Sequence, residues 1–190
     1  MTSPNPAIVC RLEEYRGYLR VLAAAVLAPR YQGKVDLSGV VQWTLYEAAK
    51  SPSFGWLDDR DQCRAYLRTL LGRNLTDEVR KFQTERRDVA REQSLQHLLD
   101  DTNLRLEAIL ASPELSPSQV LSKNEQLLQV TLALTHLPDA QRQALILRYL
   151  QQASITDIAV ALNRTTDAVA GLLKRGLKEL RLLLDRREFE

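Results

Sequence analysis

The 190-residue sequence is poor in residues that build metal sites, since it has only two cysteines and two histidines. Cys10 and Cys63 lie far apart, and neither they nor His97 and His136 fall at the spacing of metal ligands, so we expect no metal ion and no cofactor. The longest uncharged apolar run, residues 21–29, is far too short to span a membrane. The amino terminus also lacks the pattern of a signal peptide. These absences predict a cytoplasmic protein without membrane insertion.

The sequence also lacks the motifs of the common catalytic sites. It has no glycine-rich phosphate loop, no HExxH zinc motif and no GxSxG nucleophile motif. Asp58, Asp59 and Asp61 cluster in a loop, but three neighbouring acids that lack histidine or cysteine support are usually a solvated turn. We therefore expect that the protein is not an enzyme.

Glycine and proline are scarce, with seven of each, and long stretches are rich in leucine, alanine, arginine and glutamate. Hydrophobic and charged contents of 45% and 26% are those of a soluble globular protein. We predict an all-α fold of two small helical domains, residues 8–98 and 117–187, joined by a flexible acidic linker over residues 99–116. From the spacing of apolar residues, the expected helices are 8–28, 36–50, 61–82, 87–99, 117–135 and one that opens at Pro138, with a loop over 51–56.

The net charge of +2 is too small to indicate a nucleic-acid partner, but the charge is unevenly distributed. Residues 64–91 hold eight basic and four acidic side chains, and residues 164–187 hold seven basic and three acidic ones. Residues 100–122, between them, hold four acids and one arginine. Each basic block is consistent with a phosphate-binding surface or, as is commoner for a charge run, with a solvated helix face.

Residues 154–178, SITDIAVALNRTTDAVAGLLKRGLK, have the pattern of a helix-turn-helix. Ser154 and Asp157 are spaced as a capping box, and apolar residues follow at helical spacing. Asn163 suits the left-handed conformation of a tight turn, and either of the two threonines that follow can cap a second helix. A short helix, a tight turn and a second helix with a basic end fit a DNA major groove. A bare helical hairpin would show the same pattern.

The sequence around this motif resembles the last domain of extracytoplasmic-function (ECF) sigma factors of RNA polymerase. The similar segments are LPDAQR at residues 137–142, LILRY at 145–149, the helix-turn-helix itself, and KRGLKELR at 174–181. Their order and spacing are those of the family. Two segments, VVQWTLYEA and AVAGLLKRGLKELR, are most similar to a subgroup associated with planctomycetes-type bacteria.

Two segments of the amino-terminal half resemble the same family independently. DLSGVVQWTL at residues 36–45 resembles the helix that holds core RNA polymerase. YLRTLLGRNL at residues 66–75, with Asp77 and Arg80, resembles the helix that meets the melted promoter. Trp43 departs from the family pattern, in which an acid usually stands at that position.

The resemblance implies a set of contacts for each of these two helices. The implied contacts with core RNA polymerase are Asp36, Val40, Val41, Gln42, Leu45 and Glu47. The implied contacts with the −10 strand are Arg73, Asn74, Arg80 and Lys81, a set rich in the cations that phosphates require. Phe54 and Trp56, on the loop before the second helix, either hold flipped bases or pin the loop onto the core.

For the −35 duplex, the resemblance implies contacts near the start of the second helix of the helix-turn-helix. The residues closest to base edges would be Arg164, Thr165, Thr166 and Asp167, whereas Lys174 and Arg175 would meet phosphates. Ala170 and Gly171 stand where relatives commonly carry lysine and serine. The helix is therefore poor in base-reading side chains, and readout of DNA shape is an alternative.

We therefore predict an ECF-type sigma factor whose partners are core RNA polymerase and promoter DNA. An anti-sigma factor is a common partner in this family, but nothing in the sequence identifies one. Two alternatives stay open. A polymerase-independent helix-turn-helix regulator would leave the first domain unexplained, and a sigma-like adaptor that does not read DNA would fit the sparse recognition helix.

Overall fold

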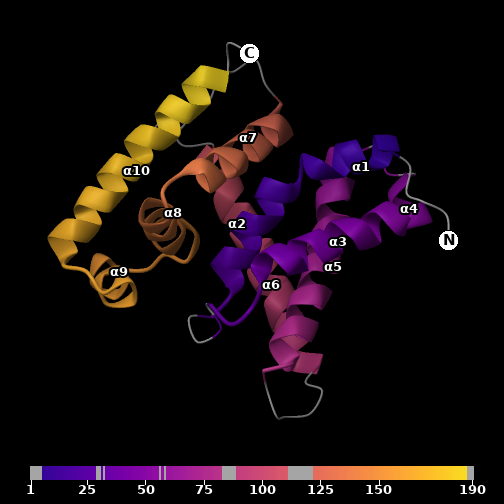
Figure 1. Ribbon diagram of the computed structural model, residues 1–190, viewed down its shortest axis with the longest axis horizontal. Helices are drawn as coiled ribbons and strands as arrows, with labels where there is room; N and C mark the ends of the chain where they lie inside the picture. The colour runs from indigo at the N-terminus through magenta and orange to yellow at the C-terminus, as the bar shows by residue number, and fades with distance from the viewer. Residues whose placement is uncertain are drawn as a thin grey trace. The chain divides into compact units, whose positions relative to one another are not determined.

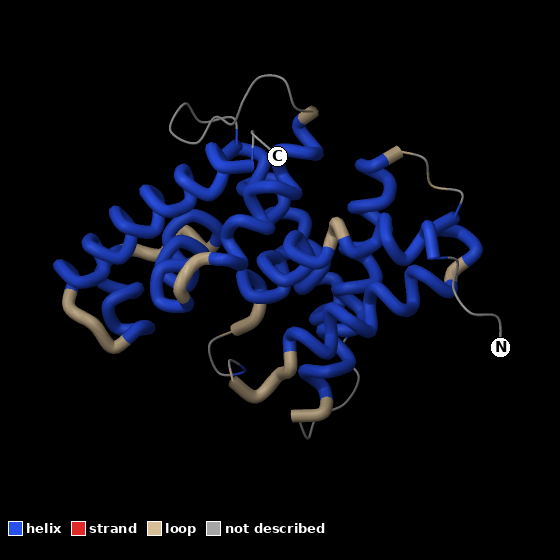
Figure 2. Tube along the Cα trace, turned by 45° about the horizontal axis from the view of Figure 1, so that its top comes forward, coloured by secondary structure: helices blue, strands red, loops and turns tan. Residues whose placement is uncertain are grey.

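The structure, a computed structural model, describes residues 6–28, 31, 33–55, 57, 59–82, 89–110 and 122–187. Within these ranges every regular element is a helix, as Figure 2 shows, so the predicted all-α fold is confirmed. The chain divides into two compact units, Met1–Asp101 and Thr102–Glu190. The division falls within α6, one of the helices labelled in Figure 1. The helices are α1 (Pro6–Glu13), α2 (Arg16–Val26), α3 (Leu37–Lys50), α4 (Pro52–Gly55), α5 (Arg60–Arg80), α6 (Val89–Leu110), α7 (Lys123–His136), α8 (Asp139–Leu145), the π-helix η2 (Ile146–Leu150), α9 (Ile155–Leu162) and α10 (Thr166–Arg187).

Helix α3 is the centre of the first unit, where it packs against α1, α2, α4 and α5. The core around it consists of aliphatic and aromatic side chains that are less than 2% exposed, among them Tyr18, Leu19, Val41, Leu67 and Leu71. Asp59 starts α5, because its carboxylate accepts a hydrogen bond from the Asp61 backbone N–H at 2.9 Å. Helix α5 ends at Arg80, so both of its ends lie close to the predicted bounds, 61–82.

The segment that we predicted as one helix over residues 8–28 is two helices, α1 and α2, separated by Glu14 and Tyr15. Tyr15 is buried, and its backbone N–H donates to the carbonyl of Leu12 at 3.0 Å. The turn places this aromatic ring in the core and lets both helices pack on α3. Helical spacing alone did not reveal the break, because buried apolar residues continue on both sides of it.

Helix α6 runs from Val89 to Leu110, whereas we predicted a helix ending at Leu99 and a flexible linker from that point. Leu99, Leu106 and Leu110 are buried. Burial of these side chains stabilises the helix across a segment that we predicted as a linker because of its acidic composition. The first part of the predicted linker is therefore helical.

Helix α7 begins at Lys123, later than the start that we predicted at residue 117. Ser122 Oγ accepts from the Glu125 N–H at 3.3 Å, and the Glu125 carboxylate accepts from the Ser122 N–H at 3.0 Å. The sequence contained this capping box, but we placed the start of the helix earlier because of the Ser-Pro pair at residues 116–117. Residues 111–121 lie outside the described part of the chain.

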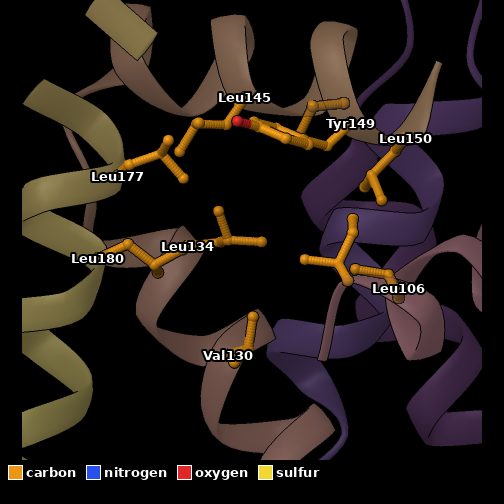
Figure 3. A pocket seen from close by; sticks show the side chains of 10 residues that line it. Leu106, Val130, Leu134, Leu145, Tyr149, Leu150, Leu177 and Leu180 are labelled. Atoms are coloured by element: carbon orange, nitrogen blue, oxygen red, sulfur yellow. The ribbon is translucent and has the colours of Figure 1, made fainter. Parts of the chain in front are cut away.

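The second unit has an apolar pocket, shown in Figure 3. The labelled side chains that line it come from α6, α7, α8, η2 and α10: Leu106, Val130, Leu134, Leu145, Tyr149, Leu150, Leu177 and Leu180. The π-helix η2, which we did not predict, contributes two of them. Its wider turn appears in the bond from the Gln151 N–H to the Ile146 carbonyl, at 3.0 Å. None of the helices in the described ranges has both the length and the hydropathy needed to cross a lipid bilayer.

Candidate nucleic-acid interface

Helices α9 and α10 form the predicted helix-turn-helix, and the expected signals at its ends are present. Ser154 Oγ accepts from the Asp157 N–H at 3.1 Å, and the Asp157 carboxylate accepts from the Ser154 N–H at 3.3 Å. Asn163 ends α9 in the left-handed region, with φ of 51°. Thr165 Oγ1 then accepts from the Ala168 N–H at 3.2 Å, so this threonine caps α10. Short-range hydrogen bonds thus set the angle of the turn.

A small apolar core supports the two helices from behind. Ile158 on α9 and Val169 on α10 are fully buried against each other's helix. Gly176 lies where α10 crosses α8, and a Cβ there would be 3.1 Å from Leu145 Cδ1 and 3.4 Å from Gln141 Cβ. Glycine therefore suits this crossing, where a larger side chain would require Leu145 or Gln141 to shift. The start of α10 is exposed to solvent, and the apolar core behind it is closely packed.

The solvent side of the turn and of α10 carries the side chains that we predicted for the −35 duplex. All of these are exposed: Arg164, Thr165, Thr166, Asp167, Lys174 and Arg175. Thr165 differs from the others because its hydroxyl is engaged in the cap of α10. The Arg175 guanidinium lies along Gly171, where an added Cβ would be 3.2 Å from Nη1.

Lys178 and Arg181 are exposed on the same side of α10, and we did not predict them. Their positions follow Lys174 by four and seven residues, the spacing of one helix face. With Arg175 they extend the cationic surface along the second half of the helix. A long cationic surface of this kind suits the phosphates that border a groove.

Comparison with known protein families decides what kind of helix-turn-helix this is. Residues 127–180 match the family described as sigma-70, region 4. The second unit contains a region 4 domain. The matched segment begins in α7, ends in α10 and covers little more than a quarter of the chain. No curated protein matches the chain.

The region 4 match supports a DNA-binding role, of the kind that sigma factors have, for α9 and α10. The sigma-70 region 4 family is a transcription-factor domain and not a catalytic domain. The exposed side of α10 is therefore the candidate nucleic-acid interface of the second unit. Among the described residues, no group of His, Cys, Asp and Glu side chains is arranged to hold a metal ion.

In the first unit, three of the residues that the resemblance implied as polymerase contacts belong to the core. Val40, Val41 and Leu45 are 6%, 0% and 5% exposed. Their apolar side chains pack α3 against its neighbours and are not exposed to a partner, contrary to our prediction. Asp36 and Gln42, in contrast, are exposed.

Asn74 joins α5 to α3. Its Nδ2 donates to Glu47 Oε2 at 2.8 Å and to Thr44 Oγ1 at 3.1 Å. The Thr44 hydroxyl donates in turn to the Val40 carbonyl at 2.8 Å. Both hydrogens of the Asn74 amide are thus used inside the unit, whereas we predicted that this residue contacts the promoter strand.

The cations that we predicted for the −10 strand lie along α5 and just after it. Arg73 is exposed. Arg80 pairs with Asp77 at 3.0 Å, and Lys81 pairs with Glu78 at 2.5 Å. Such solvent-exposed pairs contribute little stability, so a phosphate can replace the carboxylate at small cost.

Phe54 is fully buried, and its environment favours the second of the two roles that we considered for it. Arg11 Nη2 donates to the Phe54 carbonyl at 3.0 Å, and the Arg11 guanidinium carbon lies 4.8 Å from the centre of the Phe54 ring. The Tyr66 ring centre is 6.0 Å away. Phe54 therefore pins α4 to the core and is not available to a base. Trp56 lies outside the described residues.

An aromatic cluster on α3 was missed by our sequence reading. Trp43 is 54% exposed and Tyr46 is 39% exposed, with ring centres 5.3 Å apart. Lys50 Nζ lies 4.4 Å from the centre of the Tyr46 ring, a cation–π contact. We call Trp43, Tyr46 and Lys50 the aromatic face of α3. The sequence did carry a signal for this face: its residues are spaced by three and then four positions, which places them on one side of the helix, away from the buried side.

Arg68 on α5 connects three helices of the first unit. It donates from Nε to Asp100 Oδ1 on α6 at 2.9 Å and from Nη1 to the Tyr18 hydroxyl on α2 at 3.1 Å. Burial acts to lower the pKa of Arg68, but Tyr18 and Asp100 more than offset this and raise it. Burial also raises the pKa of Tyr15 to about 12. The Arg68 side chain is 15% exposed and Tyr15 is 1% exposed, so we assign both residues structural roles.

Proposed function

We propose that this protein is an ECF-type sigma factor, which binds core RNA polymerase and directs it to promoters. The observation that carries the proposal is the region 4 match over a helix-turn-helix whose exposed face is cationic. The resemblance of residues 36–45 and 66–75 to the polymerase-binding and promoter-melting helices of the family supports the rest.

In the second unit, Arg164, Thr166 and Asp167 would reach base edges of the −35 element, because the start of a recognition helix lies deepest in the groove. Lys174 and Arg175 would hold phosphates, and Lys178 and Arg181 would extend that contact. Phosphate contacts position the helix without specifying sequence. Sequence preference therefore depends on the first turn of α10 and on DNA shape.

In the first unit, Asp36 and Gln42 on the exposed side of α3 would contact polymerase. Arg73, Arg80 and Lys81 would hold the phosphates of the −10 strand. Trp56 remains our candidate for stacking on a flipped base. Asn74 acts indirectly in this scheme, because it fixes α5 against α3 through Glu47.

Capture of host genomic fragments by the tagged full-length chain, with and without the host's core RNA polymerase, separates the three possible functions. A sigma factor binds core polymerase and enriches discrete fragments only in its presence. A polymerase-independent regulator enriches the same fragments alone, as a dimer on two-fold sites. An adaptor binds polymerase and enriches no fragments.

A further inference from the structure

The turn between η2 and α9 sets the direction in which the helix-turn-helix continues from the preceding helices of the second unit. It consists of residues 151–153, and Ser154 follows as the cap of α9. Gln152 has φ of 55°, a left-handed backbone conformation that is strained for a residue with a side chain. Such a conformation persists where the contacts around it hold the backbone in place.

Hydrogen bonds within residues 146–153 supply part of that support. The Gln151 N–H donates to the Ile146 carbonyl at 3.0 Å. The Ala153 N–H donates to the Leu147 carbonyl at 2.9 Å. Arg148 Nη1 donates to the Ala153 carbonyl at 3.0 Å. These bonds hold the backbone on both sides of the left-handed residue.

A further hydrogen bond comes from Arg105 on α6, which lies 45 residues before the group that it contacts. Its Nη1 donates to the Leu150 carbonyl, at the end of η2, at 2.6 Å. The last carbonyls of a helix lack partners within the helix, so an arginine side chain is well suited to bind one of them. Arg105 thus connects the turn to a part of the second unit that is distant in sequence.

The second half of α6 places Arg105 beside η2. Leu106 is 2% exposed and lines the apolar pocket together with Leu150 (Figure 3). Leu110, one helical turn later, is also buried. Arg105 itself is half-buried, and it is the one arginine in the acidic segment 100–122. Burial of its neighbours therefore holds this single cation within reach of the turn.

The turn matters for DNA binding because α9 follows it directly and supports α10. Helix α9 packs against η2, α8 and α10, and Ile158 and Val169 are buried in one cluster between α9 and α10. Opening of the turn would therefore displace the start of α10, where Arg164 and Thr166 are exposed. A displaced recognition helix no longer brings its side chains to the base edges that they contact.

We propose that Arg105 is a positioning residue for DNA binding by the second unit, because it holds the turn at Gln152 and thereby the helix-turn-helix. This inference rests on the DNA-binding part of the proposed function. It extends the DNA-reading unit to a residue that precedes the family match at 127–180. Arg105 binds a backbone carbonyl and no phosphate in this arrangement, so its removal should leave the number of phosphate contacts unchanged.

Amide hydrogen exchange on the full-length chain tests the effect of Arg105 on the turn. Arg105→Ala should speed exchange of the Ala153 amide at least about tenfold, because the turn loses a charge-assisted bond and opens more often. The Leu19 amide, in the first unit, should be unaffected. Leu104→Ala is the matched control, because Leu104 is the neighbouring residue on α6 and is 62% exposed.

Two further variants connect the effect to the turn itself. Arg105→Lys keeps a cation but has a shorter reach, so exchange should lie between that of wild type and that of Arg105→Ala. Gln152→Gly, added to Arg105→Ala, should restore much of the protection, because glycine adopts a positive φ without strain. Thermal melts check that each variant stays folded, and Arg105→Lys carries the comparison if Arg105→Ala does not.

Duplex binding tests the consequence for function. The probe is a labelled genomic fragment that the wild-type chain enriches together with core RNA polymerase. Arg105→Ala should weaken binding of the polymerase complex to this fragment by about fivefold or more. The slope of log affinity against log salt should stay that of wild type. Gln152→Gly should recover affinity in the Arg105→Ala background.

Unchanged exchange at Ala153 in Arg105→Ala, or an equal effect of Leu104→Ala, would overturn the inference. A shallower salt slope would do so too, since it would make Arg105 a phosphate contact. Absence of recovery with Gln152→Gly would show that Arg105 does not act through the turn. If the wild-type chain enriches no fragment, the proposed function fails, and the exchange rates still decide whether Arg105 holds the turn.

Discussion

Asn74 on α5 donates a hydrogen bond to Glu47 on α3, with 2.8 Å between Nδ2 and Oε2. The family resemblance assigned these two residues to different partners, the promoter strand and the polymerase. In the folded chain they bind each other. A substitution at either residue will therefore disturb the pairing of α3 and α5 as well as any surface contact.

Asn74→Ala should lower the free energy of unfolding by about 1–2 kcal/mol, because Glu47 and Thr44 lose their donor. Glu47→Ala should have a similar effect, and the double variant should cost less than the sum of the two. Both tryptophans of the chain lie in residues 1–101, so their fluorescence during urea unfolding reports on the first unit. Gln42→Ala, an exposed change on α3, should leave the midpoint unchanged. Strictly additive effects of Asn74→Ala and Glu47→Ala would show that the bond does not form in solution.

Tyr15 should make the first unit less stable in alkaline solution. Its pKa is raised to about 12 in the folded chain, against about 10 in the unfolded chain. Between these values the unfolded chain releases the proton while the folded chain keeps it, so stability falls as pH rises from about 10 to 12. The contribution is fully present below about pH 10 and is lost as pH approaches 12. Urea midpoints measured by tryptophan fluorescence should fall more steeply for wild type than for Tyr15→Phe, and equal slopes would contradict the prediction.

Two glycines of α10 should respond in opposite ways to alanine. Gly176→Ala should destabilise the second unit by about 1–3 kcal/mol, because the new methyl group meets Leu145 and Gln141 at the crossing with α8. Gly171→Ala meets only the flexible end of Arg175, so a gain in helix propensity of up to about 1 kcal/mol should dominate. Thermal unfolding followed by far-ultraviolet circular dichroism compares the two. Equal destabilisation by both substitutions would rule out the close crossing as the cause.

The paired change Lys174→Ala and Arg175→Ala should weaken binding to all promoter sequences alike. Each lost phosphate contact should reduce the slope of log affinity against log salt by about 0.9. Asp167→Ala should change the preferred bases instead and leave that slope nearly unaltered. The measurement is binding of the polymerase complex to duplexes of different sequence over a series of salt concentrations. A change of base preference with Lys174→Ala and Arg175→Ala would reverse the roles that we assign.

The helix-turn-helix could be predicted from sequence because its determinants are local. Ser154, Asp157, Asn163 and Thr165 act within three or four residues of the backbone groups that they contact. For such local contacts, the spacing of residues in the sequence predicts which groups lie close together in the fold. The all-α class followed for the same reason, since it depends on composition and on helical periodicity.

Features that depend on distant contacts could not be predicted in this way. Phe54 packs against Arg11 and Tyr66, and no local sequence pattern distinguishes its buried ring from an exposed ring that could bind a flipped base. Asn74 finds its partners 27 and 30 residues earlier in the chain. The continuation of α6 past Leu99 likewise depends on burial of Leu106 and Leu110. The resemblance named candidate helices, but it did not tell exposed positions such as Trp43 from buried ones such as Val41.

Run-off transcription from fragmented host genomic DNA, with the host's core RNA polymerase and with or without this chain, tests the proposed function most directly. We expect discrete new transcripts that require the chain, with start sites whose upstream sequences align into two elements about two helical turns apart. Those transcripts should weaken with Lys174→Ala and Arg175→Ala. An unchanged set of transcripts, from polymerase shown to hold the chain, would contradict the assignment as a sigma factor.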